Sequence, residues 1–191
     1  MDRRELLKMI VAATGAAMIG LPALGQAQPP VASAKALFSD ADVGTLDEIA
    51  ETILPRTKTP GAKDAGTGLF MARFVSDCYT ARQQATFRAG LADIDKRAGG
   101  RFDSLAPQAR IELLRTLDAE ARKHAVEVSE TGTAEEGEAM PHYFTMLKQL
   151  AIFGFFTSKV GATGVLRYVA VPGRFDGDLA YVPGTPAWGT N

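Results

Sequence analysis

The sequence predicts an all-α protein: about five helices in a single bundle-like domain with an irregular C-terminal arm, preceded by a signal peptide. Two observations predict this class. Apolar residues recur at helical spacing in five successive segments between Phe38 and Ser158, and Pro or Gly residues separate most of them. After Tyr168 the chain becomes rich in Pro and Gly, which argues against further regular structure. A chain of 191 residues suits one such domain, and we assign residues 37–191 to it.

Residues 1–27 are predicted to be a twin-arginine signal peptide. A short charged region precedes an uncharged, weakly apolar stretch from Met9 to about Leu21. Small residues end this segment at the positions that a signal peptidase reads, so we expect cleavage after Ala27. The residues that match the twin-arginine pattern are Arg3, Arg4, Leu6, Leu7 and Lys8.

Other roles fit this N-terminal segment less well. Its many Ala and Gly residues make it too weakly apolar for a typical Sec signal, and it has no Cys for a lipid anchor. A permanent membrane helix would need about 20 strongly apolar residues. We therefore expect a periplasmic protein, exported by the twin-arginine route and associated with a membrane only through a larger complex.

The first half of the domain follows a linker at residues 28–36. Ser39 and Asp42 predict a capping box for a helix that ends at Leu54, before Pro55. A loop with a turn at Pro60-Gly61 then reaches Gly66. Two helices should follow, over residues 68–79 and 81–98. The first of these places Phe70, Phe74, Val75 and Cys78 on one face.

The second half contains the most apolar segment of the domain. Ser104 is the expected N-cap of a helix that runs to about Val128, with Pro107 in its first turn. Residues 129–139 should form an exposed loop, and residues 142–158 the longest apolar helix. Residues 159–166 suit a short turn or helix, and residues 168–171 are compatible with one strand.

The composition excludes several functions. A net charge of −1 gives no electrostatic reason to expect binding of nucleic acid or of an anionic membrane surface. His124 and His142 lie on different expected helices without a second ligand at metal-binding spacing, so no metal site is expected. His124 should be solvated near the end of its helix. The glycines from Gly61 to Gly68 follow a helix, unlike those of a nucleotide-binding loop. No cofactor is expected in this chain.

Cys78 is the one cysteine of the chain, so no disulfide can form within it. Two interpretations stay open for a periplasmic protein. The thiol is either buried as a small apolar group or forms an intermolecular disulfide with another chain.

Aromatic residues near the C-terminus suggest where a partner protein would bind. The helix at residues 142–158 has Phe on more than one face, which fits either the central core helix or a helix with one face on a partner. Aromatic residues of the irregular tail could order against their own domain or against a partner. The candidate interface residues are Phe155, Phe156, Arg174, Phe175, Tyr181 and Trp188.

Several motifs taken together resemble one known family. The first group is Ile49-Ala50-Glu51-Thr52-Ile53-Leu54-Pro55 with Thr59-Pro60-Gly61-Ala62 and Ala65-Gly66. The second is Asp77-Cys78-Tyr79. The third is Gly154-Phe155-Phe156-Thr157-Ser158 with Gly161-Ala162-Thr163, Leu166-Arg167-Tyr168, Pro172-Gly173-Arg174 and Trp188. From about residue 37 to its end, the chain resembles the gluconate 2-dehydrogenase subunit 3 family, the small subunits of periplasmic flavin-dependent sugar and polyol dehydrogenases.

The resemblance implies a three-part enzyme. A large flavoprotein subunit would carry FAD and oxidise the substrate, and a c-type cytochrome would pass the electrons on through haem c. The small subunit would bring its twin-arginine signal to the twin-arginine translocase, take the large subunit across with it and stabilise it. No catalytic residue is implied in the small subunit, and gluconate, other sugars and the 3-position of glycosides all remain candidate substrates.

One position departs from the resemblance. The family often has a Cys after the glycine that corresponds to Gly177, where this chain has Asp178. If that Cys normally pairs with the one in Asp-Cys-Tyr, Cys78 lacks its partner here.

The main alternative is a free-standing periplasmic enzyme or ligand-binding protein. Such a protein would need a convergent polar site, for which the pieces are Arg56, Lys58, Lys63, Asp64 and Arg174. A third interpretation has the chain contact the cytochrome, where it would guide electron transfer by structure alone.

Overall fold

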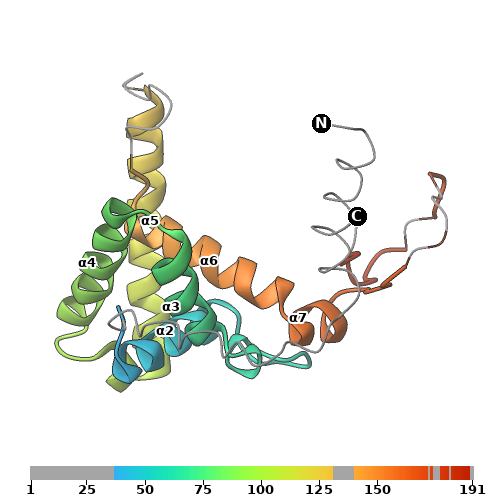
Figure 1. Cartoon of the computed structure of the whole chain (residues 1–191), viewed down its shortest axis with the longest axis horizontal. Coiled ribbons are helices and arrows are strands. Elements are labelled where there is room, and N and C mark those ends of the chain that lie inside the picture. The colour runs from blue at the N-terminus through green and yellow to red at the C-terminus, as the bar shows by residue number, and fades with distance from the viewer. Residues whose placement is uncertain (1–36, 131–139, 172, 174–176, 181, 190–191) are drawn as a thin grey trace, which may run out of the picture. The chain divides into compact units, whose positions relative to one another are not determined.

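A computed structural model describes residues 37–130, 140–171, 173, 177–180 and 182–189 (Figure 1). The chain divides into two units, residues 1–36 and 37–191. The predicted export signal and linker lie outside the described residues, as do Arg174, Phe175 and Tyr181. The described part contains six α-helices, two short 3-10 helices and no strand, which confirms the all-α prediction.

Helix α2 (Asp40–Ile53) begins and ends where local chemistry predicts. The Ser39 backbone N–H donates to Asp42 Oδ2 at 2.8 Å, and the Asp42 N–H donates back to Ser39 Oγ at 3.2 Å, so the capping box is confirmed. The buried face consists of Thr45, Leu46, Ile49 and Ala50. Pro55 follows the C-cap residue Leu54 and prevents the helix from continuing.

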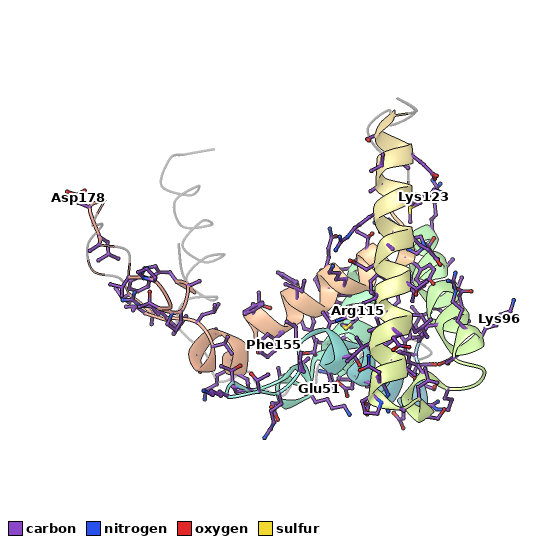
Figure 2. All side chains as sticks on the ribbon, turned by 180° about the vertical axis from the view of Figure 1, so that it is seen from behind. Glu51, Lys96, Arg115, Lys123, Phe155 and Asp178 are labelled. Atoms are coloured by element: carbon purple, nitrogen blue, oxygen red, sulfur yellow. The ribbon has the colours of Figure 1, made fainter. Side chains whose placement is uncertain are left out.

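Carboxylates of α2 hold the loop that follows it. Glu51 accepts backbone N–H bonds from Arg56 at 2.8 Å and from Lys63 at 2.9 Å, and so ties both ends of this loop to one side chain (Figure 2). The short 3-10 helix η1 (Ala62–Ala65) ends at Gly66, whose φ of 62° lies in the left-handed region that favours glycine. Helix α3 (Thr67–Cys78) then begins, and Asp47 Oδ1 accepts the Gly68 N–H at 2.7 Å.

Replacing Glu51 by alanine should therefore lower the free energy of unfolding by about 2 kcal/mol, because two backbone N–H groups lose a charged acceptor. Glu51→Gln keeps one oxygen and loses the other, so it should lie between the wild type and Glu51→Ala. Urea unfolding measures the series. Equal stability of all three proteins would contradict the role given to Glu51.

Helix α4 (Ala81–Arg97) is joined to α3 by polar side chains at a tight corner. Thr80 and Gln83 form a second capping box. The Gln84 amide nitrogen lies 3.1 Å from the carbonyl oxygens of Val75, Ser76 and Tyr79, and so satisfies the end of α3. The corner thus depends on hydrogen bonds as well as on apolar burial.

Helix α5 (Pro107–Glu130) begins later than the sequence suggested. Ser104 is not its N-cap: it ends the 3-10 helix η2 (Phe102–Ser104), and its hydroxyl donates to the Arg101 carbonyl at 2.6 Å. Pro107 is the first helical residue, where its missing N–H costs nothing. Phe102 in η2 is completely buried, and the Ser104 hydroxyl forms its hydrogen bond within this turn and not at the start of α5.

Helix α6 (Tyr143–Thr157) is the central helix of the domain, in contact with α2, α3, α4 and α5 (Figure 1). It approaches α4 and α3 closely at two glycines, which have no side chain. A Cβ at Gly90 of α4 would lie 2.3 Å from the Tyr143 ring, and one at Gly154 would lie 2.4 Å from the Phe70 ring. The largest fully buried side chains come from several elements: Phe87, Phe102, Phe144, Leu46, Ile49, Met71, Ile94, Leu117 and Leu147.

The chain after α6 ends in irregular structure. Helix α7 (Lys159–Gly164) is capped by Ser158, and Val165 is the last described residue packed against the core. The strand considered for residues 168–171 does not form; a single parallel bridge joins Arg167 to Trp188 instead. We call residues 166–189 the C-terminal arm.

Candidate interaction surface

The described ends of the C-terminal arm are fastened together at its base. The Arg167 N–H donates to the Ala187 carbonyl at 2.8 Å, and the Gly189 N–H donates to the Arg167 carbonyl at 3.0 Å. The Arg167 guanidinium lies 4.0 Å from the centre of the Trp188 ring, within cation–π range. These contacts close the arm into a loop at its start and end.

The arm exposes an unusual amount of apolar surface. The large apolar side chains exposed on it are Tyr168, Val169, Val171, Leu179, Val182 and Trp188. Elsewhere in the described residues such side chains are Leu69, Val126, Ile152 and Phe153. Apolar side chains gathered on one exposed segment are typical of a surface that another protein covers.

A hollow on the arm adds shape to this surface. Its volume is about 440 Å³. The residues that line it are mostly apolar: Arg167, Leu179, Ala180, Val182, Thr185, Pro186, Ala187 and Trp188. A pocket of this kind suits an apolar side chain from a partner, since binding energy concentrates where an anchor enters a desolvated pocket.

The phenylalanines of α6 divide between core and surface. Phe155 is 3% exposed and belongs to the core, so its ring is not available at the surface of this domain (Figure 2). Phe156 is half-buried, and its ring stands edge-on to that of Phe155. The exposed ring is Phe153, at 48%. Of the sequence-derived interface candidates, Trp188 is 44% exposed on the arm.

Phe153 extends an aromatic cluster onto the face shared by α3 and α6. Its ring centroid lies 5.9 Å from that of Phe70 and 5.8 Å from that of Phe74. Phe74 in turn meets Tyr79 edge-on at 5.8 Å. Such spacings are favourable for aromatic pairs and hold the partly exposed rings in place.

Three of the four described polar residues of the alternative binding site, Arg56, Lys63 and Asp64, take part in ion pairs. Arg56 forms an ion pair with Asp64, and Lys63 forms one with Glu48. The pair raises the pKa of Arg56 and lowers the pKa of Asp64, chiefly through their shared hydrogen bond. Asp64 Oδ2 also accepts the Gly61 N–H at 2.9 Å. This cluster therefore organises its own loop; Lys58 lies exposed beside it.

Cys78 ends α3 with an exposed thiol, so the interpretation as a buried apolar group is wrong. Cys78 lies at the exposed end of the helix: Val75, three residues earlier, is fully buried, whereas Asp77 is exposed. The exposed thiol leaves an intermolecular disulfide sterically open.

The two histidines lie together although the sequence separates them. The ring of His124 on α5 is centred 5.9 Å from that of His142, the N-cap of α6. Both side chains are half-buried, whereas the sequence suggested a solvated His124. Their proximity depends on the packing of α5 against α6, and no local sequence pattern predicts it.

Two features are absent from the described residues. None of their helices is long and apolar enough to cross a bilayer. No group of three or more His, Cys, Asp or Glu side chains within them is arranged to hold a metal ion.

A helical domain with an exposed apolar arm has the form of a subunit that assembles with other proteins. The chain belongs to the gluconate 2-dehydrogenase subunit 3 family: the family model with this description matches residues 40–173, well over half of the chain. The family name describes a subunit of a dehydrogenase complex. No curated protein and no solved structure gave a match.

Proposed function

We propose that this chain is the small, non-catalytic subunit of a periplasmic flavin-dependent dehydrogenase that acts on gluconate, another sugar or the 3-position of glycosides. It binds the catalytic flavoprotein, stabilises it and supplies the twin-arginine signal for joint export through the translocase. FAD belongs to the flavoprotein and haem c to a cytochrome subunit. The family membership supports the place in a dehydrogenase complex.

The observation that carries the binding role is the C-terminal arm. Its apolar side chains lie outside the core, and its base is closed by the Arg167–Trp188 contact. A free arm of this kind exposes apolar surface to water at a cost that burial against a partner removes. We assign the flavoprotein subunit as that partner.

The export role is tested by replacing Arg3 and Arg4 with lysine in cells that also produce the flavoprotein. Lysine keeps the charge but not the guanidinium pair of the twin-arginine pattern. Both this chain and the yellow flavoprotein should then stay in the cytoplasm. Fractionation followed by immunoblotting and flavin absorbance measures where each protein is found.

The matched control is the same pair of changes at Arg115 and Arg122, which are exposed on α5. This control should leave both proteins in the periplasm. Normal periplasmic recovery of the flavoprotein from the Arg3→Lys, Arg4→Lys variant would overturn the proposal of joint export.

A further inference from the structure

Helix α6 is capped by an imidazole, a group that can change its charge near neutral pH. His142 Nδ1 accepts the Phe144 N–H at 3.2 Å, which makes His142 the N-cap. The other side-chain caps of the described helices use oxygen atoms of Ser39, Thr80 and Ser158, and hydroxyl groups do not titrate in this range. Nδ1 can accept this bond only while it carries no proton.

The surroundings of His142 join helices α5 and α6. Its ring stacks on the Tyr143 ring at 4.4 Å, and the His124 ring from α5 is centred 5.9 Å away. Beside the two imidazoles lies a hollow of about 230 Å³. The residues that line it come from the second half of α5 and the start of α6: Ala121, His124, Ala125, Val128, Met140, Pro141, His142 and Thr145.

The nearby carboxylates are already engaged with other partners. Arg97 of α4 donates to Asp93 at 2.7 Å and to Glu120 of α5 at 2.7 Å. The Tyr143 hydroxyl donates to Asp93 at 2.7 Å. The two carboxylates balance the positive charge of Arg97. The pKa of Tyr143 is raised above its usual range, chiefly because the hydroxyl is desolvated and then because it donates to Asp93. A charged His142 would thus lose hydration, be repelled by His124 and Arg97, and be attracted by Glu120 and Asp93, two carboxylates that already have partners.

Protonation of His142 has three local consequences. The proton at Nδ1 turns the acceptor into a donor that faces the Phe144 N–H, so the cap is lost. The new positive charge stands at the helix N-terminus, which the helix dipole disfavours. The same charge repels Arg97 and a charged His124. All three effects weaken the junction between the start of α6 and the second half of α5.

We propose that His142 is a pH-sensitive cap that holds the start of α6 against α5, and that its protonation opens this junction. The proposal rests on the cap geometry and the histidine pair, independently of the function proposed above.

The folded protein favours the neutral form of His142, so a lower pH should weaken the junction between α5 and α6. Burial, followed by the charge of His124, lowers the pKa of His142 from its ordinary value of 6.5. The stabilisation is therefore complete above pH 6.5 and is lost as the pH falls through the lower value in the folded protein. Asp93, whose pKa is lowered mainly by the Tyr143 hydrogen bond, stays ionised over this range.

Hydrogen exchange of the full chain at about pH 7.5 and about pH 5, corrected for the chemical exchange rate, tests the proposal over the range in which histidine titrates. In the wild type, peptides from the second half of α5 and the first turn of α6 should lose protection at least several-fold at the lower pH. Peptides from α2 and α3 should not.

The decisive variant is His142→Asn, which keeps an N-cap acceptor and removes the titration. Its protection should be the same at both pH values. His124→Asn should keep the transition but move it to higher pH, because a repelling charge is gone. If His142→Asn fails to fold, His142→Ser supplies the same kind of cap. Equal protection of the wild type at both pH values, or an equal loss in the asparagine variant, would overturn the proposal.

Discussion

Replacing Phe155 by alanine is expected to lower the free energy of unfolding by about 3–5 kcal/mol, the usual cost of removing a buried phenylalanine ring. The side chain is 3% exposed and belongs to the core cluster. Its ring stands edge-on to Phe156 at 5.0 Å, so the change also removes a favourable aromatic contact. Unfolding by urea, followed by circular dichroism, measures the difference.

The control for this prediction lies two positions earlier on the same helix. Phe153 is 48% exposed, and Phe153→Ala should cost less, about 1–2 kcal/mol, because the ring is only partly removed from water although it contacts the rings of Phe70 and Phe74. The two variants delete the same atoms from the same helix, but Phe155 is almost completely buried, whereas Phe153 is half exposed and contacts two other rings. Similar losses of stability in both would contradict the placement of Phe155 in the core.

Introducing charges on the C-terminal arm is expected to abolish assembly with the flavoprotein. We choose Leu179→Asp together with Val182→Asp, since both residues are exposed and both line the hollow on the arm. A carboxylate that must enter a desolvated interface loses its hydration without gaining a partner. The amount of flavoprotein recovered with a tagged chain should fall at least about tenfold, which corresponds to about 1.4 kcal/mol.

The structure supplies a matched control for the arm variant. Val126 on α5 is 53% exposed, close to Leu179 at 53% and Val182 at 57%, but it lies outside the arm. Val126→Asp should leave flavoprotein recovery unchanged. Neither variant should shift the unfolding midpoint appreciably, since these side chains are not part of the core cluster. If less flavoprotein were recovered with both the arm variant and Val126→Asp, or with neither, the arm would not be part of the interface.

Local signals predicted the helices well because caps and breakers act over a few residues. The Ser39–Asp42 capping box and the position of Pro107 in the first turn were both confirmed. The start of α5 was predicted too early, because Ser104 has the chemistry of an N-cap but serves the preceding 3-10 turn. A serine by itself does not show which of two adjacent turns it stabilises.

The candidate interaction surface was predictable only in part. Aromatic composition drew attention to the tail, and Trp188 is indeed placed on the exposed arm. Its contact with Arg167 was missed, because the two residues are far apart in the sequence and neither belongs to a regular pattern. The exposed aliphatic residues Val171, Leu179 and Val182 were missed as well, since an isolated Val or Leu in a loop looks like any other apolar residue.

The sequence by itself determined the helical class, most helix ends and the family resemblance that the family model supports. Only the tertiary structure decided that Phe155 is buried, that Cys78 is exposed and that His124 meets His142. The reason is physical. Helix period and capping depend on neighbours along the chain. Burial depends on which faces of separate helices pack together, and an almost uniformly apolar helix such as α6 carries little periodic signal to orient it.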